Sequence, residues 1–259
     1  MEYQPSKFWQ QLNKDCDRLL AERGYENFKN TLGLIYNNYY FDGIKLADDY
    51  EERLRHFWEL LYQTLPYNLL VQFDEPSEGN PLTIEFNGRR VSFDLGMSLY
   101  EYNLLFSYID FSKVKVIHEI GAGYGRTAYV ISKLHPDINY RIFDVEPSLG
   151  IARRYLTSVN PDGRFKFNTP DKLEVPCDLL IAIDCLHEMT QEHVAEYFDY
   201  ADKNARYFYF SVFEKTHTPL DELDWEIKDY PKRETWNTLL SRKHLFRQEA
   251  FEVLYQCQR

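Results

Sequence analysis

A glycine-rich loop near the middle of the chain constrains the fold most. The run VIHEIGAGYG at residues 116–125 begins as a short apolar strand, passes an acid at Glu119, and then has glycine at every second position. Glycine is needed there because the backbone must turn sharply and let a ligand approach it closely. A dinucleotide-binding loop, G-x-G-x-x-G, would need a third glycine where this chain has Arg126. The spacing therefore argues against an NAD(P)-dependent oxidoreductase.

Strands and helices are expected to alternate around this loop. Near-continuous apolar runs separated by helical patterns indicate a parallel sheet covered on both faces. The expected strands are residues 114–120, 140–145, 164–167, 178–183 and 207–212, with helices at about 124–134, 147–155 and 191–201. Residues 236–240 and 251–256 are expected to pair as an antiparallel edge. The predicted fold is α/β, with a Rossmann-like, mostly parallel seven-stranded sheet and an antiparallel C-terminal edge.

The first part of the chain has a different pattern. Apolar residues recur at spacings of three and four from Phe8 to Leu20 and from Tyr50 to Leu61, as on the buried faces of two helices. Asn87-Gly88 lies between two β-rich runs and is typical of a type I′ hairpin turn. A further helix is expected at 99–108. We therefore predict a mainly helical N-terminal cap with a hairpin over residues 1–98, which helps bind the acceptor, and a catalytic domain over residues 99–259.

The composition narrows the range of partners. The 259 residues carry a formal charge of −11, and an acidic chain is repelled by phosphate backbones, so no nucleic-acid partner is expected. No apolar run is long enough for membrane insertion, and the first residues lack a signal-peptide pattern. The four cysteines are scattered without a CxxC motif, which fits reduced thiols. We expect a cytoplasmic protein, and the sequence allows an oligomer.

A second acid follows the glycine loop at an informative distance. Asp144 ends the expected second strand, 23 residues after Gly121. A carboxylate at this place can accept hydrogen bonds from both hydroxyls of a ribose, as the acid about 20 residues after the loop does in dinucleotide folds. A solvated or helix-capping role is the alternative for such an acid. Glu146 is the fallback for the ribose role.

The pattern E-x-G-x-G-x-G resembles motif I of class I methyltransferases. This resemblance implies S-adenosylmethionine as the cofactor. The residues that it places at the cofactor are Glu119, Gly121, Ala122, Gly123, Asp144, Val145 and Asp184. The run DLLIAIDCLHEM at 178–189 is similar to the fourth strand of these enzymes, which ends over the transferring methyl group. His187 is therefore the candidate catalytic base, since imidazole titrates near neutral pH. Helix capping, or packing under the loop, is the alternative for His187.

A metal-assisted mechanism is a further alternative. Acids at the ends of the fourth and fifth strands can supply oxygen ligands to a divalent cation. Asp184 is well placed for this, but the fifth strand ends in SVFE, without an Asp-Asn pair. Glu214 and His217 could still approach the site. No metal is predicted.

The central motifs, together with FDVEP at 143–147 and ARRYL at 152–156, resemble the sugar O-methyltransferase family. This resemblance implies methyl transfer to a hydroxyl of a sugar or sugar nucleotide, often in glycan biosynthesis. The candidate acceptor contacts are Tyr39, Tyr124, Arg126 and Glu188. Tyr39 belongs to the segment YNNYY at 36–40, which either covers the site or packs between the cap and the core. His118 stands where the family usually has an aliphatic residue. Another small-molecule acceptor, or a non-catalytic S-adenosylmethionine-binding protein, remains an alternative.

Overall fold

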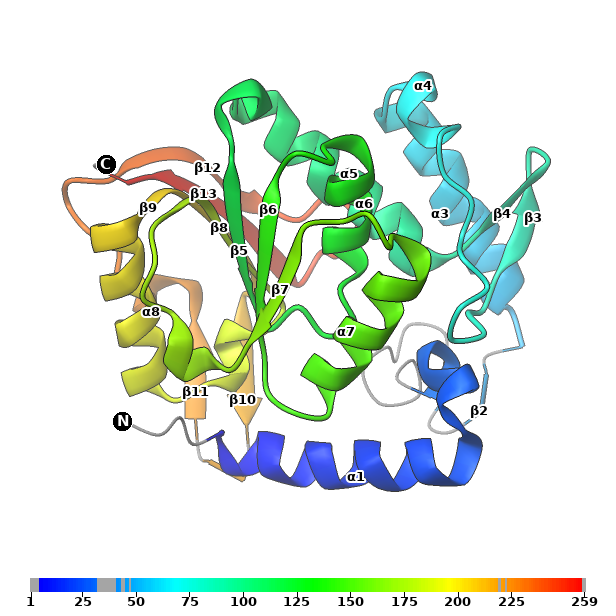
Figure 1. Cartoon of the computed structure of the whole chain (residues 1–259), viewed down its shortest axis with the longest axis horizontal. Helices are drawn as coiled ribbons and strands as arrows, with labels where there is room; N and C mark the ends of the chain where they lie inside the picture. Colours follow the sequence, from blue (N-terminus) through cyan, green and yellow to red (C-terminus); the bar gives the residue numbers. More distant parts are fainter. Residues whose placement is uncertain are drawn as a thin grey trace.

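A seven-stranded sheet forms the centre of the protein, as the computed structural model in Figure 1 shows. The structure describes residues 5–31, 41–42, 45–46, 48–218, 220–221 and 223–257. The strand order is β12-β13-β9-β8-β5-β6-β7. Strands β5 to β9 pair in parallel, whereas β13 is antiparallel to both β9 and β12. The predicted sheet, with its antiparallel C-terminal edge, is confirmed.

The bounds of the central elements are close to those expected from the sequence. The strands are β5 (Val116–Ile120), β6 (Asn139–Phe143), β7 (Phe165–Asn168), β8 (Cys177–Ile183), β9 (Ala205–Phe213), β12 (Asn237–Lys243) and β13 (Ala250–Gln256). The helices between them are α6 (Arg126–Leu134), α7 (Ser148–Val159) and α8 (Gln191–Asn204). Short 3-10 turns occur at Phe111–Lys113 (η2), Pro170–Lys172 (η3), Leu186–Glu188 (η4) and Ile227–Asp229 (η5).

Both faces of the sheet are buried, which explains the continuous apolar strands. In β8, Leu179 and Ile181 pack in the cluster that contains α6 and α7, whereas Leu180 and Ala182 pack in the cluster that contains α8. Successive side chains of a strand point to opposite faces, so each face needs its own apolar set. Figure 1 shows α8 on one side of the sheet and α6 and α7 on the other.

The N-terminal part consists of helices and short hairpins. Its elements are α1 (Lys7–Arg23), η1 (Tyr25–Asn27), β1 (Phe41–Asp42), β2 (Lys45–Leu46), α3 (Tyr50–Thr64), α4 (Tyr67–Leu70), β3 (Ile84–Phe86), β4 (Arg89–Val91) and α5 (Phe93–Tyr108). The turn between β3 and β4 has positive φ at both Asn87 (51°) and Gly88 (72°), as a type I′ turn requires. Helix α5 begins six residues before the expected start at Leu99, because the Ser92 hydroxyl accepts the Leu95 N–H (3.0 Å) and caps it.

One hydrophobic core joins the N-terminal part to the sheet. It contains Phe57 and Trp58 of α3 as well as Ile117 and Ile142 of the central strands. A buried ion pair between Lys29 and Glu75 lies in the same region, and Lys29 Nζ also donates to the Tyr155 hydroxyl of α7 (3.2 Å). The predicted division at residue 98 falls within α5. The division into a cap and a catalytic domain stays a prediction.

The structure contains one hairpin that the sequence did not predict, and it shows where His118 lies. A hairpin of β10 (Lys215–Thr218) and β11 (Leu223–Glu226) follows β9 directly and was not expected. His118 is buried in β5, where its Nδ1 lies 2.9 Å from the Tyr200 hydroxyl, and burial lowers its pKa to about 3. His118 is therefore a neutral core residue.

All four cysteines are buried, and none of them forms a disulfide. In the part of the chain that the structure describes, no helix has both the length and the apolar character needed to cross a membrane.

Candidate active site

The glycine loop follows β5 at the carboxyl edge of the parallel strands. Gly121 and Gly123 have φ values of 64° and 58°, which favour glycine. A Cβ atom on Gly121 would lie 2.5 Å from Cys185 Cβ, so this glycine lets the loop pack against the end of β8. A Cβ on Gly123 would meet no atom within 4 Å. Gly123 therefore leaves its backbone accessible to a ligand.

Asp144, directly after β6, is hydrogen-bonded to this loop. Its Oδ2 accepts the Gly123 N–H (2.8 Å) and its Oδ1 accepts the Val145 N–H (2.7 Å). Burial raises the pKa of Asp144 to about 7, although both N–H groups favour the carboxylate. Glu146, the fallback for the ribose role, instead accepts the Gly150 N–H (2.9 Å) of α7. Asp144 is thus the acid that the structure brings to the glycine loop.

A cavity of about 20 Å³ lies beside these residues. Its lining includes three of the residues expected at the cofactor, Gly121, Asp144 and Val145. The other lining residues come from several elements and were not anticipated: Pro5, Trp9, Ile120, Phe143, Pro170, Cys185, Met189 and Tyr197. Pro5 and Trp9 are more than 100 positions from the loop, so no local sequence signal could have placed them there.

Glu119 lies under the glycine loop rather than on its surface. Its Oε2 accepts a hydrogen bond from the Tyr140 hydroxyl (2.7 Å). Burial raises the pKa of Glu119 to about 8, and the hydrogen bond from Tyr140 offsets only part of this effect. Ala122, in the loop itself, is also buried.

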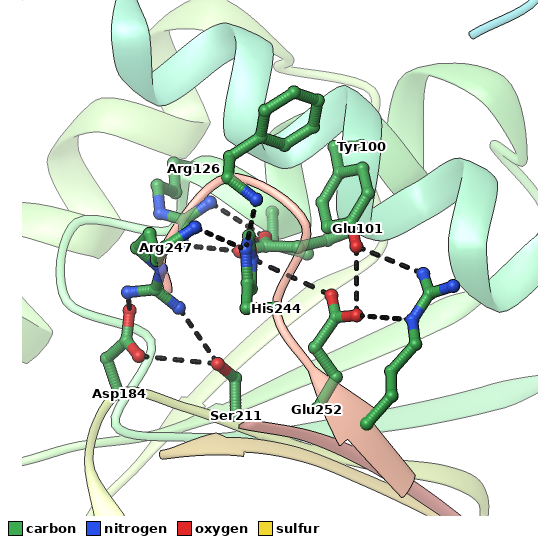
Figure 2. A network of polar contacts seen from close by, with 11 residues as sticks. Tyr100, Glu101, Arg126, Asp184, Ser211, His244, Arg247 and Glu252 are labelled. Atoms are coloured by element: carbon green, nitrogen blue, oxygen red, sulfur yellow. Dashed lines mark hydrogen bonds and ion pairs between the residues drawn. The ribbon is translucent and has the colours of Figure 1, made fainter. Parts of the chain in front are cut away.

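Asp184 immediately follows β8 and has a positive φ of 56°. Figure 2 shows that Arg247, from the connection between β12 and β13, reaches its carboxylate and also the Ser211 hydroxyl of β9 (2.8 Å). Burial alone would raise the pKa of Asp184, but the Arg247 guanidinium lowers it. The loop that carries Arg247 is fixed because His244 Nδ1 accepts the N–H groups of Phe246 (3.1 Å) and Arg247 (3.2 Å). Arg247 is 63 residues from Asp184, and no sequence pattern predicted this ion pair.

His187 lies in η4, three residues after Asp184. Its side chain is buried against the Phe213 ring, and burial lowers its pKa to about 4, so the imidazole is neutral at pH 7. Its Nε2 is 3.8 Å from Glu188 Oε1, and its Nδ1 has no hydrogen-bond partner among the described residues. Burial raises the pKa of Glu188 to about 8, and the side chain of Trp9 hydrogen-bonds to this carboxyl group. His187 is therefore a neutral imidazole with one ring nitrogen that lacks a partner, and its burial disfavours the protonated form.

The expected acceptor contacts have different surroundings. The Tyr124 hydroxyl donates to Asp94 Oδ2 (2.6 Å), and its ring packs against Tyr155. Arg126 forms a bidentate ion pair with the buried Glu101 (2.7 and 2.8 Å). Figure 2 shows this pair next to Arg247. Tyr124 and Arg126 thus both have protein partners in this structure. Tyr39 lies outside the described residues.

Two residues that were considered as metal ligands form ion pairs with other side chains. Glu214 pairs with Lys243 (3.0 Å), and His217 pairs with Asp224 in the β10–β11 hairpin (2.9 Å). Within the described ranges, no group of three or more His, Cys, Asp or Glu residues could hold a metal ion.

Residues 94–206, from α5 to the start of β9, match the family model of the O-methyltransferase domain. This segment, less than half of the chain, contains the glycine loop, Asp144, Asp184 and His187. No curated protein sequence matches the chain.

Several solved structures are similar at low sequence identity. An O-methyltransferase family protein from Burkholderia thailandensis is 13% identical, with a TM-score of 0.45, over 64% of this chain and 58% of that one. This chain thus spans less than two thirds of that protein. Mitomycin 7-O-methyltransferase is 14% identical, with a TM-score of 0.47, over 97% of this chain and 67% of that one. The magnesium protoporphyrin IX methyltransferase from Synechocystis PCC 6803 is 12% identical, with a TM-score of 0.49, over 79% of this chain and 97% of that one.

Proposed function

We propose that this protein transfers a methyl group from S-adenosylmethionine to a hydroxyl group of a small-molecule acceptor. The observation that carries the proposal is the buried Asp144 carboxylate, which the Gly123 and Val145 N–H groups hold at the glycine loop. This arrangement lies within the segment that matches the O-methyltransferase domain.

The residues around the cavity fit this cofactor. Each Asp144 oxygen uses one lone pair on a main-chain N–H, which leaves one on each for a ribose hydroxyl. The open side of Gly123 allows close approach to the backbone. Asp144 lines the cavity, and a sulfonium cation nearby would favour its ionised form against the effect of burial. With S-adenosylmethionine bound, Asp144 and Val145 would hold the ribose, and residues 121–123 would contact the rest of the molecule.

When bound, S-adenosylmethionine supplies a methyl group whose bond to sulfur breaks, with the electron pair staying on sulfur, as the bond to the acceptor oxygen forms. His187 is the proposed base for the proton that the acceptor hydroxyl loses, since its imidazole is neutral and its Nδ1 has no hydrogen-bond partner among the described residues. Burial and the charge of Arg247 disfavour the resulting imidazolium, whereas the ionised Asp184 carboxylate favours it. The residues of this chain thus position the oxygen and remove its proton.

For the acceptor, we propose a sugar or a sugar nucleotide. This finer assignment rests on the resemblance of the central motifs to sugar O-methyltransferases. Tyr39, Tyr124, Arg126 and Glu188 remain the predicted acceptor contacts. The acidic composition and the cysteines, which form no disulfide, support a cytoplasmic location.

Calorimetry with S-adenosylmethionine, and separately with NADH, tests the cofactor. We expect binding of S-adenosylmethionine alone, and its absence at millimolar concentration contradicts the proposal. Transfer of a radiolabelled methyl group to a panel of sugar nucleotides, free sugars and phenols then tests the acceptor. We expect His187→Ala to lower turnover about 10²–10⁴-fold, whereas His56→Ala, at an exposed position of α3, is the matched control. Binding without transfer to any acceptor would favour a non-catalytic binding protein.

A further inference from the structure

Helix α1 lies across the carboxyl ends of the parallel strands, as Figure 1 shows. Its first turn and the chain just before the helix face the cofactor site, since Pro5 and Trp9 line the cavity together with Gly121, Asp144 and Cys185. The cavity that remains, about 20 Å³, has room for about one water molecule. Small-molecule sites are typically about 300–1,000 Å³. With α1 in this position, the space left beside Asp144 is too small for S-adenosylmethionine.

The first turn of α1 is held by a small number of polar contacts. The two carboxylate oxygens of Asp221, in the connection between β10 and β11, accept the N–H groups of Lys7 (2.9 Å) and Phe8 (2.8 Å). The Ser6 hydroxyl donates to the Glu188 main-chain carbonyl (3.0 Å). The Trp9 side chain hydrogen-bonds to the Glu188 carboxyl group. The helix start is thus attached to two segments at the rim of the site.

The rest of α1 adds little buried surface. Cys16 is the one residue of α1 that is buried. Local opening is easiest where few apolar contacts are buried and the holding bonds are near the surface. Undocking the first turn would break the Asp221 and Glu188 contacts and leave the central core of the protein intact.

We propose that residues 5–9, at the start of α1, form a lid over the cofactor site. These residues undock to admit S-adenosylmethionine, and Pro5 and Trp9 then close over it as the outer wall of the site. Asp221 is the latch that holds the closed lid, because it caps the helix start. The inference rests on the proposed function, since it takes the cavity as the S-adenosylmethionine site.

The test uses the 259-residue protein and two measurements. The first is the release rate of S-adenosylmethionine, followed by displacement with excess S-adenosylhomocysteine. The second is hydrogen exchange of the amides at the start of α1, with and without S-adenosylmethionine. The variant Asp221→Ala removes the latch, and Asp224→Ala, in the same hairpin but paired with the exposed His217, is the matched control.

We expect Asp221→Ala to release S-adenosylmethionine about fivefold faster, the size of a lost helix cap, and Asp224→Ala to release it at the wild-type rate. Bound S-adenosylmethionine should slow exchange at the start of α1 in the wild-type protein. Trp9→Ala should weaken binding about tenfold, and Trp9→Phe, which keeps an aromatic ring, should restore most of it.

An unchanged release rate in Asp221→Ala, together with unchanged exchange in α1 on binding, would overturn the lid while leaving the proposed function intact. Failure of the wild-type protein to bind S-adenosylmethionine overturns the proposed function and the lid together. The wild-type and variant measurements therefore separate the two.

Discussion

Replacing Asp144 by asparagine tests the cofactor site most directly. Asparagine has the same shape but only one acceptor oxygen, whereas Asp144 accepts the N–H groups of both Gly123 and Val145. The side-chain NH2 of asparagine must therefore face one of these N–H donors, and the side chain can offer at most one oxygen to a ribose. A hydrogen bond to a charged group contributes about 1.5–3 kcal/mol. We expect the dissociation constant for S-adenosylmethionine to rise about 10- to 150-fold.

The same substitution should leave the free energy of unfolding unchanged or raise it, although it weakens binding. Burial raises the pKa of Asp144 from 3.8 to about 7, so the folded state at pH 8 holds a carboxylate that the buried site disfavours. A shift of this size corresponds to about 4 kcal/mol. Asparagine removes this cost but leaves one N–H without an acceptor, at about 1–3 kcal/mol. The Asp144→Asn protein should therefore be no less stable than the wild type at pH 8.

Calorimetry at pH 8 and thermal unfolding of the same samples provide the measurement. Asp178→Asn is the matched control, since Asp178 Oδ2 also accepts two main-chain N–H groups, from Lys115 (2.8 Å) and Val116 (3.0 Å), at the opposite edge of the sheet. We expect this control to bind S-adenosylmethionine as the wild type does. A folded Asp144→Asn protein that binds within threefold of the wild type would refute the ribose role.

Three further predictions concern the loop and the core. Gly121→Ala should lower stability by at least about 2 kcal/mol in urea unfolding, because its Cβ meets Cys185 at 2.5 Å and its φ is positive; Gly123→Ala, with open space at its Cβ, should lose less, and equal losses would contradict this. Lys29→Met should cost about 3–5 kcal/mol in the same assay, since it leaves a buried carboxylate unpaired; a loss below 1 kcal/mol would count against the pair's burial. Burial raises the pKa of Glu119 to about 8, so the folded state binds a proton that the unfolded state has lost, and Tm should fall as the pH rises from about 5 to 8. Glu119→Gln should reduce this fall, and an identical pH profile would show that another group causes it.

The sequence predicted the central sheet well because its signals are local. Continuous apolar strands, a glycine loop and a helix at each crossover all point to the same architecture. The β10–β11 hairpin was missed because its strands, KTHT and LDWE, are short and mostly polar, so no alternation of apolar residues marks them. The start of α5 was missed because Phe93 extended the apolar pattern of the hairpin strand, whereas the hydroxyl of Ser92 caps the helix.

The site was predictable only where its residues follow strand ends. Asp144 and Asp184 come directly after β6 and β8, and the parallel sheet brings those ends together. Arg247 and Trp9 reach the same edge from an irregular loop and from the first helix, and their positions depend on tertiary contacts that no periodicity encodes. Arg126 was expected at the acceptor, but the buried Glu101 that pairs with it lies in a helix whose pattern is simply apolar.

The burial of every cysteine gives a practical way to follow the protein in solution. Thiol reagents attack exposed thiolates, and the four native thiols are all buried, with burial raising the pKa of Cys257 to about 12. A cysteine introduced at Lys14, on the exposed face of α1, would therefore accept a fluorophore without competition from native sites. Cys185 has a second use, because it lines the cavity that α1 covers. The rate at which Cys185 is alkylated would measure how often α1 moves away from the cavity.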